Sequence, residues 1–152
     1  MINTTLCYIE KDQCYLMLFR NKKPDDPNEG KWVGVGGKFE EGETPDQCLL
    51  REVWEETGVQ LTDYVYRGLV HFVSDIWEDE EMYLYSGYDY DGEISSVCSE
   101  GELSWIKISE VCSLNLWEGD KCFLELMAAG EKDFELTLRY EGDTLVSKER
   151  IK

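Results

Sequence analysis

The segment between Thr44 and Gly58 restricts the fold more than any other part of the chain, because it carries both ends of one α-helix. Thr44 is a residue type that caps helix N-termini, Pro45 suits the first helical position, and Gln47 completes a capping box with Thr44. Gly58 stands where a left-handed residue commonly ends a helix. The sequence therefore predicts a helix over 44–57.

Three glutamates lie on one side of this predicted helix. Glu52, Glu55 and Glu56 are spaced i, i+3 and i+4, which places them on one face at 3.6 residues per turn. Like charges at this spacing repel, so they do not stabilise the helix. Hard oxygen ligands that converge from one face are what Mg²⁺ or Mn²⁺ requires. For the three glutamates alone, a simply solvated helix face remains the alternative.

The residues next to these glutamates offer further groups suited to a metal ion or a phosphate. Glu43 would add a carboxylate or a supporting hydrogen bond. Gly36 and Gly37 let backbone groups approach a metal ion or a phosphate closely, and Lys38 adds a cation beside them. Arg51 would offset part of the repulsion among the helical glutamates. The pattern therefore favours metal-assisted chemistry on a phosphorylated substrate.

Residues 37–59 resemble the Nudix box, G-x5-E-x7-R-E-U-x-E-E-x-G-U, in which U is a bulky aliphatic residue. The stretch reads GKFEEGETPDQCLLREVWEETGV. The specified positions are filled by Gly37, Glu43, Arg51, Glu52, Val53, Glu55, Glu56, Gly58 and Val59. A chance match in a chain of this composition is expected roughly once in a million. The resemblance implies a Nudix hydrolase, with an α/β/α sandwich around a mixed central sheet.

The resemblance also implies roles for the matching residues. Glu55 and Glu56 would be metal ligands, with Glu56 exposed, and Glu52 would be a ligand or the base that activates water. Arg51 would orient the glutamates, and the Gly36 carbonyl would add a metal contact. The ion would be Mg²⁺, with Mn²⁺ as the alternative. It would neutralise the diphosphate oxygens and lower the pKa of the attacking water.

Residues outside this helix would complete the site. Glu43 would support catalysis, Lys38 would touch a phosphate, and Lys23 would bind phosphate from the Pro-containing loop. In related enzymes a further acidic ligand comes from a downstream loop. Glu100 is the candidate here, and Glu102 is its close rival.

Two further segments resemble the MutT-like group, which hydrolyses oxidised purine nucleoside triphosphates to the monophosphate and pyrophosphate. Residues 32–38 read WVGVGGK, which is similar to the stretch before the box in that group. Residues 116–120, LWEGD, are similar to the base-binding segment of animal oxidised-purine triphosphatases. By this resemblance Trp117 would stack on the base, Asp120 would accept from the purine edge, and Phe72 would line the same pocket.

Two positions depart from the pattern of the animal enzymes. Val33 stands where they have an Asn, and its side chain cannot hydrogen-bond a base. Gly119 replaces the first of their two acids. Preference for 8-oxoguanine is therefore left open, whereas stacking on a purine is retained. An ordinary core aromatic is the alternative interpretation of Trp117.

The rest of the chain predicts a mixed α/β (α+β) fold in a single domain over residues 1–152. Runs rich in β-branched and aromatic residues predict strands, and an apolar run ended by Gly130 predicts a second helix. The expected strands are 2–10, 13–20, 32–35, 66–75, 81–90, 102–108, 134–140 and 144–148, and the second helix is 117–129.

Composition and charge exclude several classes of protein. The net charge of −18 disfavours nucleic-acid polymers, which need basic patches, and requires a phosphorylated substrate to arrive with divalent cations or to meet local basic groups. No apolar stretch is long enough for a membrane span and no export signal is apparent, so a cytoplasmic protein is expected. The six cysteines, without a C-x-x-C pair, are expected to be reduced thiols.

The function expected from these observations is Mg²⁺-dependent hydrolysis of a nucleoside diphosphate-linked substrate. An oxidised purine nucleoside triphosphate such as 8-oxo-dGTP is the leading substrate, and the protein would act as a monomer or a homodimer. An ADP-ribose or dinucleoside polyphosphate pyrophosphatase is the second possibility. A non-catalytic nucleotide sensor of the same fold is the third, although sensors typically lack box glutamates that are all present here.

Overall fold

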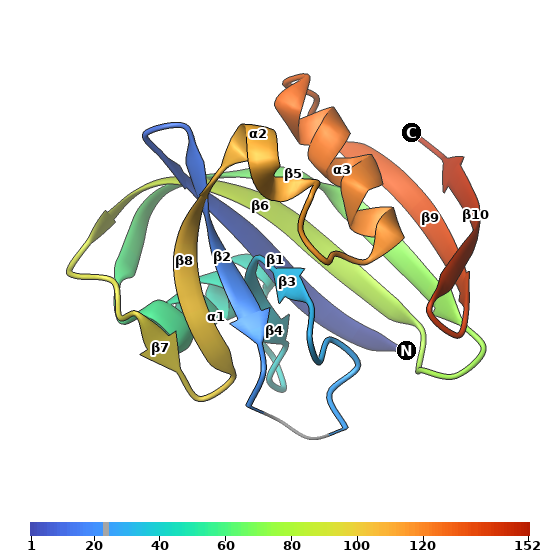
Figure 1. Cartoon of the computed structure of the whole chain (residues 1–152), viewed down its shortest axis with the longest axis horizontal. Helices are drawn as coiled ribbons and strands as arrows, with labels where there is room; N and C mark the ends of the chain where they lie inside the picture. Colours follow the sequence, from blue (N-terminus) through green and yellow to red (C-terminus); the bar gives the residue numbers. More distant parts are fainter. Residues whose placement is uncertain (23–24) are drawn as a thin grey trace.

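The computed structural model describes residues 1–22 and 25–152 and contains a mixed β-sheet with helices on both faces (Figure 1). Lys23, which was predicted to bind phosphate, lies outside the described residues. The strands are β1 (Ile2–Lys11), β2 (Cys14–Arg20), β3 (Trp32–Val33), β4 (Val35–Lys38), β5 (Gln60–Ser74), β6 (Glu80–Asp91), β7 (Val97–Cys98), β8 (Gly101–Lys107), β9 (Phe134–Glu141) and β10 (Thr144–Arg150). The helices are α1 (Pro45–Thr57), α2 (Ile108–Val111) and α3 (Glu118–Ala128).

The sheet is mixed, as predicted. Its strands follow the order β10-β9-β5-β6-β1-β2-β8-β7, with β3 paired to β2 and β4 paired to β1. The pairs β1–β6 and β5–β9 are parallel, and the others are antiparallel. Pairing of β4 with the centre of β1 is what positions the site, because it holds the glycines of β4 beside helix α1.

The predicted capping of α1 is confirmed. The Thr44 hydroxyl accepts a hydrogen bond from the Gln47 amide at 3.2 Å, and the Gln47 side chain accepts one from the Thr44 amide at 3.0 Å. Gly58 ends the helix with a φ of 81°, a left-handed conformation that glycine adopts without a steric penalty. These local bonds fix the start and end of α1, and hence the direction in which its glutamates point.

Two hydrophobic cores lie on opposite faces of the sheet. Strand β1 divides its side chains between them, because successive residues of a strand point to opposite faces. Cys7 and Ile9 pack with Leu49 and Val53 of α1, whereas Tyr8 packs with Phe123 of α3. The arrangement of helix, sheet and helix is the sandwich that the sequence predicted.

Several local features differ from the predicted elements, and one of them is the short strand β7, which was not predicted. Strand β5 begins at Gln60 instead of residue 66, because irregularities in its register with β6 interrupt the alternation on which the prediction relied. The predicted strand 32–35 is divided at Gly34, where a Cβ would lie 2.7 Å from the Cys7 carbonyl oxygen. The short helix α2 was not predicted. Across the described part of the chain, no helix is long and apolar enough to cross a bilayer.

Candidate active site

Helix α1 presents its three glutamates to different environments. Glu55 is exposed, with 52% of its side chain accessible, whereas the accessible fraction of Glu52 is 13%. Glu56 is only 5% exposed, so the expectation of an exposed carboxylate at this position was wrong. Its place on the helix explains the burial, because it shares a face with Leu49 and Val53, which pack against the sheet.

Glu56 is held by the glycine-containing strand β4. The Gly36 amide donates a hydrogen bond of 2.6 Å to Glu56 Oε2. The second oxygen, Oε1, is buried and accepts no hydrogen bond from the described residues. A buried carboxylate oxygen without a partner is costly, so this atom is suited to receive a cation.

Glu52 lies directly against Gly37. A Cβ on Gly37 would lie 2.5 Å from the carboxylate carbon of Glu52 and 2.6 and 2.7 Å from its oxygens. The absence of a side chain at residue 37 is therefore what allows Glu52 to reach the backbone of β4. Burial is the main cause that raises the pKa of Glu52, and hydrogen bonding to Arg51 opposes it.

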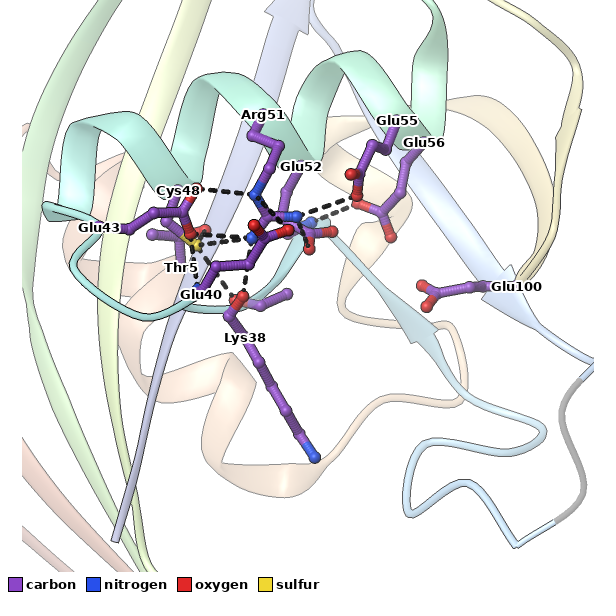
Figure 2. Close-up of polar contacts among 12 residues, drawn as sticks. Thr5, Lys38, Glu40, Glu43, Cys48, Arg51, Glu52, Glu55, Glu56 and Glu100 are labelled. Atoms are coloured by element: carbon purple, nitrogen blue, oxygen red, sulfur yellow. Dashed lines mark hydrogen bonds and ion pairs between the residues drawn. The ribbon is translucent and has the colours of Figure 1, made fainter.

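Arg51 links the carboxylates of this region (Figure 2). Its Nε and Nη2 donate to the two oxygens of Glu43 at 2.7 and 2.9 Å. Its Nη1 donates to Glu52 at 2.9 Å and to Glu55 at 3.0 Å. Hydrogen bonds from the guanidinium lower the pKa of Glu43 to about 2. Arg51 thus orients the glutamates, as the sequence suggested, and Glu43 is its bidentate anchor.

Glu100 reaches the same region from the turn between β7 and β8. Its carboxylate points toward the glutamates of α1 in Figure 2, and hydrogen bonding and charge from Glu100 add to burial in raising the pKa of Glu56. Arg20 donates to Glu100 at 2.9 Å and to Asp26 at 2.8 Å. The rival candidate Glu102 is exposed on β8. The structure therefore brings Glu100 to the site, and Arg20 is a positioning residue that sequence reasoning missed.

The donor set fits a hard divalent ion. Glu52, Glu56 and Glu100 offer carboxylate oxygens, which suit Mg²⁺ and Mn²⁺ better than softer metals. Within residues 1–22 and 25–152, no three His, Cys, Asp or Glu side chains are already grouped closely enough to hold a metal. Arg51 holds Glu52 and Glu55 in ion pairs of 2.9 and 3.0 Å. Binding an ion would require these carboxylates to turn away from Arg51.

Lys38 extends away from these glutamates (Figure 2). Its backbone carbonyl accepts a hydrogen bond from Arg51 at 2.9 Å, so its position in β4 is fixed by the same network. Its ammonium lowers the pKa of Glu80, a residue of β6, against the raising effect of burial. Lys38 therefore lies between the glutamates of α1 and the α3 side of the sheet.

Trp117 and Phe72 lie on the α3 side of the sheet and meet through one tyrosine. Trp117 contacts Tyr140 edge-on at a ring distance of 5.1 Å, and Phe72 lies 6.4 Å from the same ring. Asn28 accepts a hydrogen bond from Trp117 Nε1 at 2.8 Å, and the Lys31 ammonium lies 4.7 Å from the centre of the Trp117 ring. The predicted stacking residue is thus partly buried and held by the loop that precedes β3.

Asp120 lies in the first turn of α3, and only 4% of it is exposed. No described residue is hydrogen-bonded to its carboxyl group. Burial raises its pKa to about 8, the charge of Glu80 adds to this effect, and Lys31 opposes it. The three predicted base-binding residues are therefore brought together, and the structure adds Glu80 and Lys31 to them. Glu80 was missed because the predicted strand began at residue 81, whereas β6 begins at Glu80 and places it on the same face as Met82.

Comparison with known proteins is consistent with this geometry. The NUDIX domain model matches residues 3–127. An uncharacterised Nudix hydrolase of Bacillus subtilis is 29% identical over 140 residues, which cover 90% of this chain and 85% of that protein. The oxidized purine nucleoside triphosphate hydrolase of Danio rerio is 27% identical over 124 residues, covering 80% and 78% of the two chains. The crystal structure of a MutT protein from Bacillus halodurans superimposes with a TM-score of 0.87 at 28% identity, covering 99% of this chain and 98% of that one.

The chain belongs to the Nudix family. It is a Nudix hydrolase with MutT-like relatives, and enzymes of this family act on pyrophosphate bonds of small nucleotide substrates with the help of divalent metal ions.

Proposed function

We propose that the protein is a Mg²⁺-dependent pyrophosphohydrolase of purine nucleoside triphosphates, oxidised ones included, which it converts to the monophosphate and pyrophosphate. One observation carries the proposal. Strand β4, which holds Gly36 and Gly37 against the glutamates of α1, also carries Lys38, whose ammonium lowers the pKa of Glu80 on the α3 side of the sheet. A nucleotide has the same two ends, because its phosphates require cations and its base requires stacking and a polar edge.

The carboxylates supply the phosphate end of the site. Glu52, Glu55, Glu56 and Glu100 would hold Mg²⁺, or Mn²⁺ in its place, with the Gly36 carbonyl as a backbone ligand. The bound ion supplies charge neutralisation on the diphosphate oxygens and a more acidic water. Arg51 maintains the orientation of the glutamates, and the raised pKa of Glu52 suits a group that accepts a proton from the attacking water.

Positive charge at the phosphates must come from a few local groups, since the net charge of the chain is −18. Lys38, which follows Gly37 in β4, is the proposed phosphate contact among them. Lys23 remains a proposed phosphate contact. Mg²⁺ brought with the triphosphate would supply the remaining positive charge.

The base end of the site would use stacking and one neutral acid. Trp117 and Phe72 offer aromatic surface on either side of Tyr140. Asp120, with a pKa of about 8, is protonated at neutral pH, so it offers one hydrogen-bond donor and one acceptor. The Watson–Crick edge of a purine presents the matching acceptor and donor. These observations support a purine substrate.

The reaction products test the proposal. The protein is incubated with Mg²⁺ and 8-oxo-dGTP, dGTP, dATP, ADP-ribose or diadenosine tetraphosphate, and the products are separated by ion-exchange chromatography. Release of pyrophosphate with a nucleoside monophosphate is expected. Release of ribose phosphate with AMP would instead assign an ADP-ribose pyrophosphatase, and cleavage only of the dinucleotide would assign a dinucleoside polyphosphatase. Nucleotide binding without turnover would assign a sensor.

The role of Glu56 is tested by the substitution Glu56→Gln. The amide oxygen keeps the hydrogen bond from the Gly36 amide, but the negative charge that a metal ion requires is lost. We expect kcat/KM with Mg²⁺ to fall at least about 100-fold while the fold is retained. Glu41→Gln is a matched control, because Glu41 is exposed and its substitution removes the same charge from the same segment. Unchanged turnover of Glu56→Gln would refute the assigned role.

A further inference from the structure

Glu80 is a charged residue on the apolar face of a central strand. On β6 it points to the same side of the sheet as Met82 and Leu84, both of which belong to the α3-side core. Its direct partner on β5 is Phe72. A carboxylate at such a position is costly to bury, so its retention in the folded state calls for a partner.

The hydrogen bonds of Glu80 leave one oxygen available. The Thr4 hydroxyl donates to Glu80 Oε2 at 2.6 Å. Burial raises the pKa of Glu80, and the Thr4 hydrogen bond and the Lys38 ammonium partly oppose this effect. No described residue donates to Oε1, and the side chain is partly exposed. Glu80 therefore offers a fixed carboxylate oxygen that can accept a hydrogen bond from a ligand.

A second, unpartnered carboxyl group faces the same place. Asp120 is 4% exposed and its side chain has no hydrogen-bond partner among the described residues. Both groups belong to the α3 side of the sheet, and the charge of Glu80 adds to burial in raising the pKa of Asp120. Trp117 and Lys31 lie at the same end of α3, and both are partly exposed. Two carboxyl groups, an aromatic ring and an ammonium thus lie in the same region on the α3 side of the sheet.

We propose that Glu80 accepts a hydrogen bond from the 2-amino group of a guanine-type base and thereby selects 2-amino-6-oxopurine nucleotides. The inference rests on the proposed function, because it assigns the substrate class of the same site. A protonated Asp120 can donate to one acceptor on the base and accept from one donor. In guanine these are O6 and N1–H, and in adenine they are N1 and N6–H. Only the guanine edge has a further donor, the 2-amino group, and Glu80 supplies the acceptor for it.

The comparison of guanine with hypoxanthine isolates this contact, since the two bases differ only in the 2-amino group. Binding of dGMP and dIMP is measured by titration calorimetry in the presence of Mg²⁺, which needs no turnover. A hydrogen bond to a charged acceptor corresponds to about 10- to 100-fold in affinity, and we expect this preference for dGMP in the wild-type protein.

Two substitutions of Glu80 test the assignment. Glu80→Met removes the acceptor and keeps the length of the side chain, so the preference for dGMP is expected to fall below about 3-fold, chiefly by weaker dGMP binding. Glu80→Gln retains one carbonyl oxygen, which can accept from the base while the amide nitrogen donates to the Thr4 hydroxyl, and an intermediate preference is expected. Glu81→Met is the matched control, because Glu81 lies on the opposite face of the same strand beside His71. Its preference should equal that of the wild type.

The outcomes separate this inference from the proposed function. Equal dissociation constants of wild-type protein for dGMP and dIMP would overturn the role of Glu80, even if triphosphates are hydrolysed to pyrophosphate. A preference for dGMP that Glu80→Met does not reduce would also overturn it. Conversely, a Glu80-dependent preference in a protein that releases no pyrophosphate would support the base contact and refute the triphosphate activity. Thermal unfolding of each variant shows whether a loss of binding reflects loss of the fold.

Discussion

Asp120 should make the stability of this protein depend on pH in a predictable direction. Burial, with a contribution from Glu80, raises its pKa from 3.8 to about 8 in the folded state, against a weaker opposing effect of Lys31. In the unfolded chain the group ionises near its ordinary value. A raised pKa means that the folded state holds the proton more tightly. Its contribution to stability is therefore fully present below pH 3.8 and is lost as pH rises toward 8.

The size of this effect follows from the shift. Each pKa unit corresponds to about 1.4 kcal/mol, so between pH 4 and pH 7 ionisation of Asp120 in the unfolded chain lowers the free energy of unfolding by roughly 4 kcal/mol. Asp120→Asn has nearly the same shape and no ionisable group. The variant should therefore become more stable than the wild type as pH rises, by about 1.4 kcal/mol per pH unit across this window.

Urea-induced unfolding at pH 5, 6 and 7 measures the effect. The quantity of interest is the free energy of unfolding of Asp120→Asn minus that of the wild type, because the pH dependence of the other acidic groups cancels in the difference. In a Glu80→Gln background the same difference should level off at a lower pH, since the substitution removes a charge that raises the pKa of Asp120. A difference that stays constant from pH 5 to pH 7 would show that Asp120 is ionised in the folded protein, which would refute the reasoning.

Two further predictions concern the metal-binding end of the site. In Gly37→Ala the new Cβ would meet the carboxylate of Glu52 at 2.5 Å. Because the end of a side chain can move, we expect the fold to persist while kcat/KM falls at least about 10-fold. A fully active variant would contradict the packing of Glu52 on β4. Adding Mg²⁺ at 100 times its dissociation constant should stabilise the folded state by about 2.7 kcal/mol and raise Tm by about 5–10 °C, and removal by a chelator should reverse this. The matched comparison is Glu56→Gln, whose Tm should respond little to Mg²⁺.

The helix that carries the site was predictable because its determinants are local. Thr44 and Gln47 bond each other within one turn, and Gly58 adopts its left-handed conformation at the end of the same helix. The i, i+3, i+4 spacing of the glutamates follows from the geometry of any α-helix. The same reasoning failed for β5, where irregular pairing with β6 interrupts the alternation that marks a strand.

Burial of the individual acids was decided by tertiary packing. Glu56 was expected to be exposed, but α1 lies on the sheet so that this side chain faces the Gly36 amide. The choice between Glu100 and Glu102 also needed the fold, because only the turn between β7 and β8 determines which acid points toward α1. Spacing along the chain does not determine distances between elements that are separated by a sheet.

By itself, the sequence determined the helix, its caps, the acidic face and the Nudix box, since each is set by residues within a few turns of one another. Only the tertiary structure brought Glu80 of β6 next to Phe72 of β5 and within electrostatic reach of Asp120 on α3. These residues are far apart along the chain and carry no common motif. They meet because strand pairing and helix packing join distant segments, and the shared burial raises the pKa of both acids.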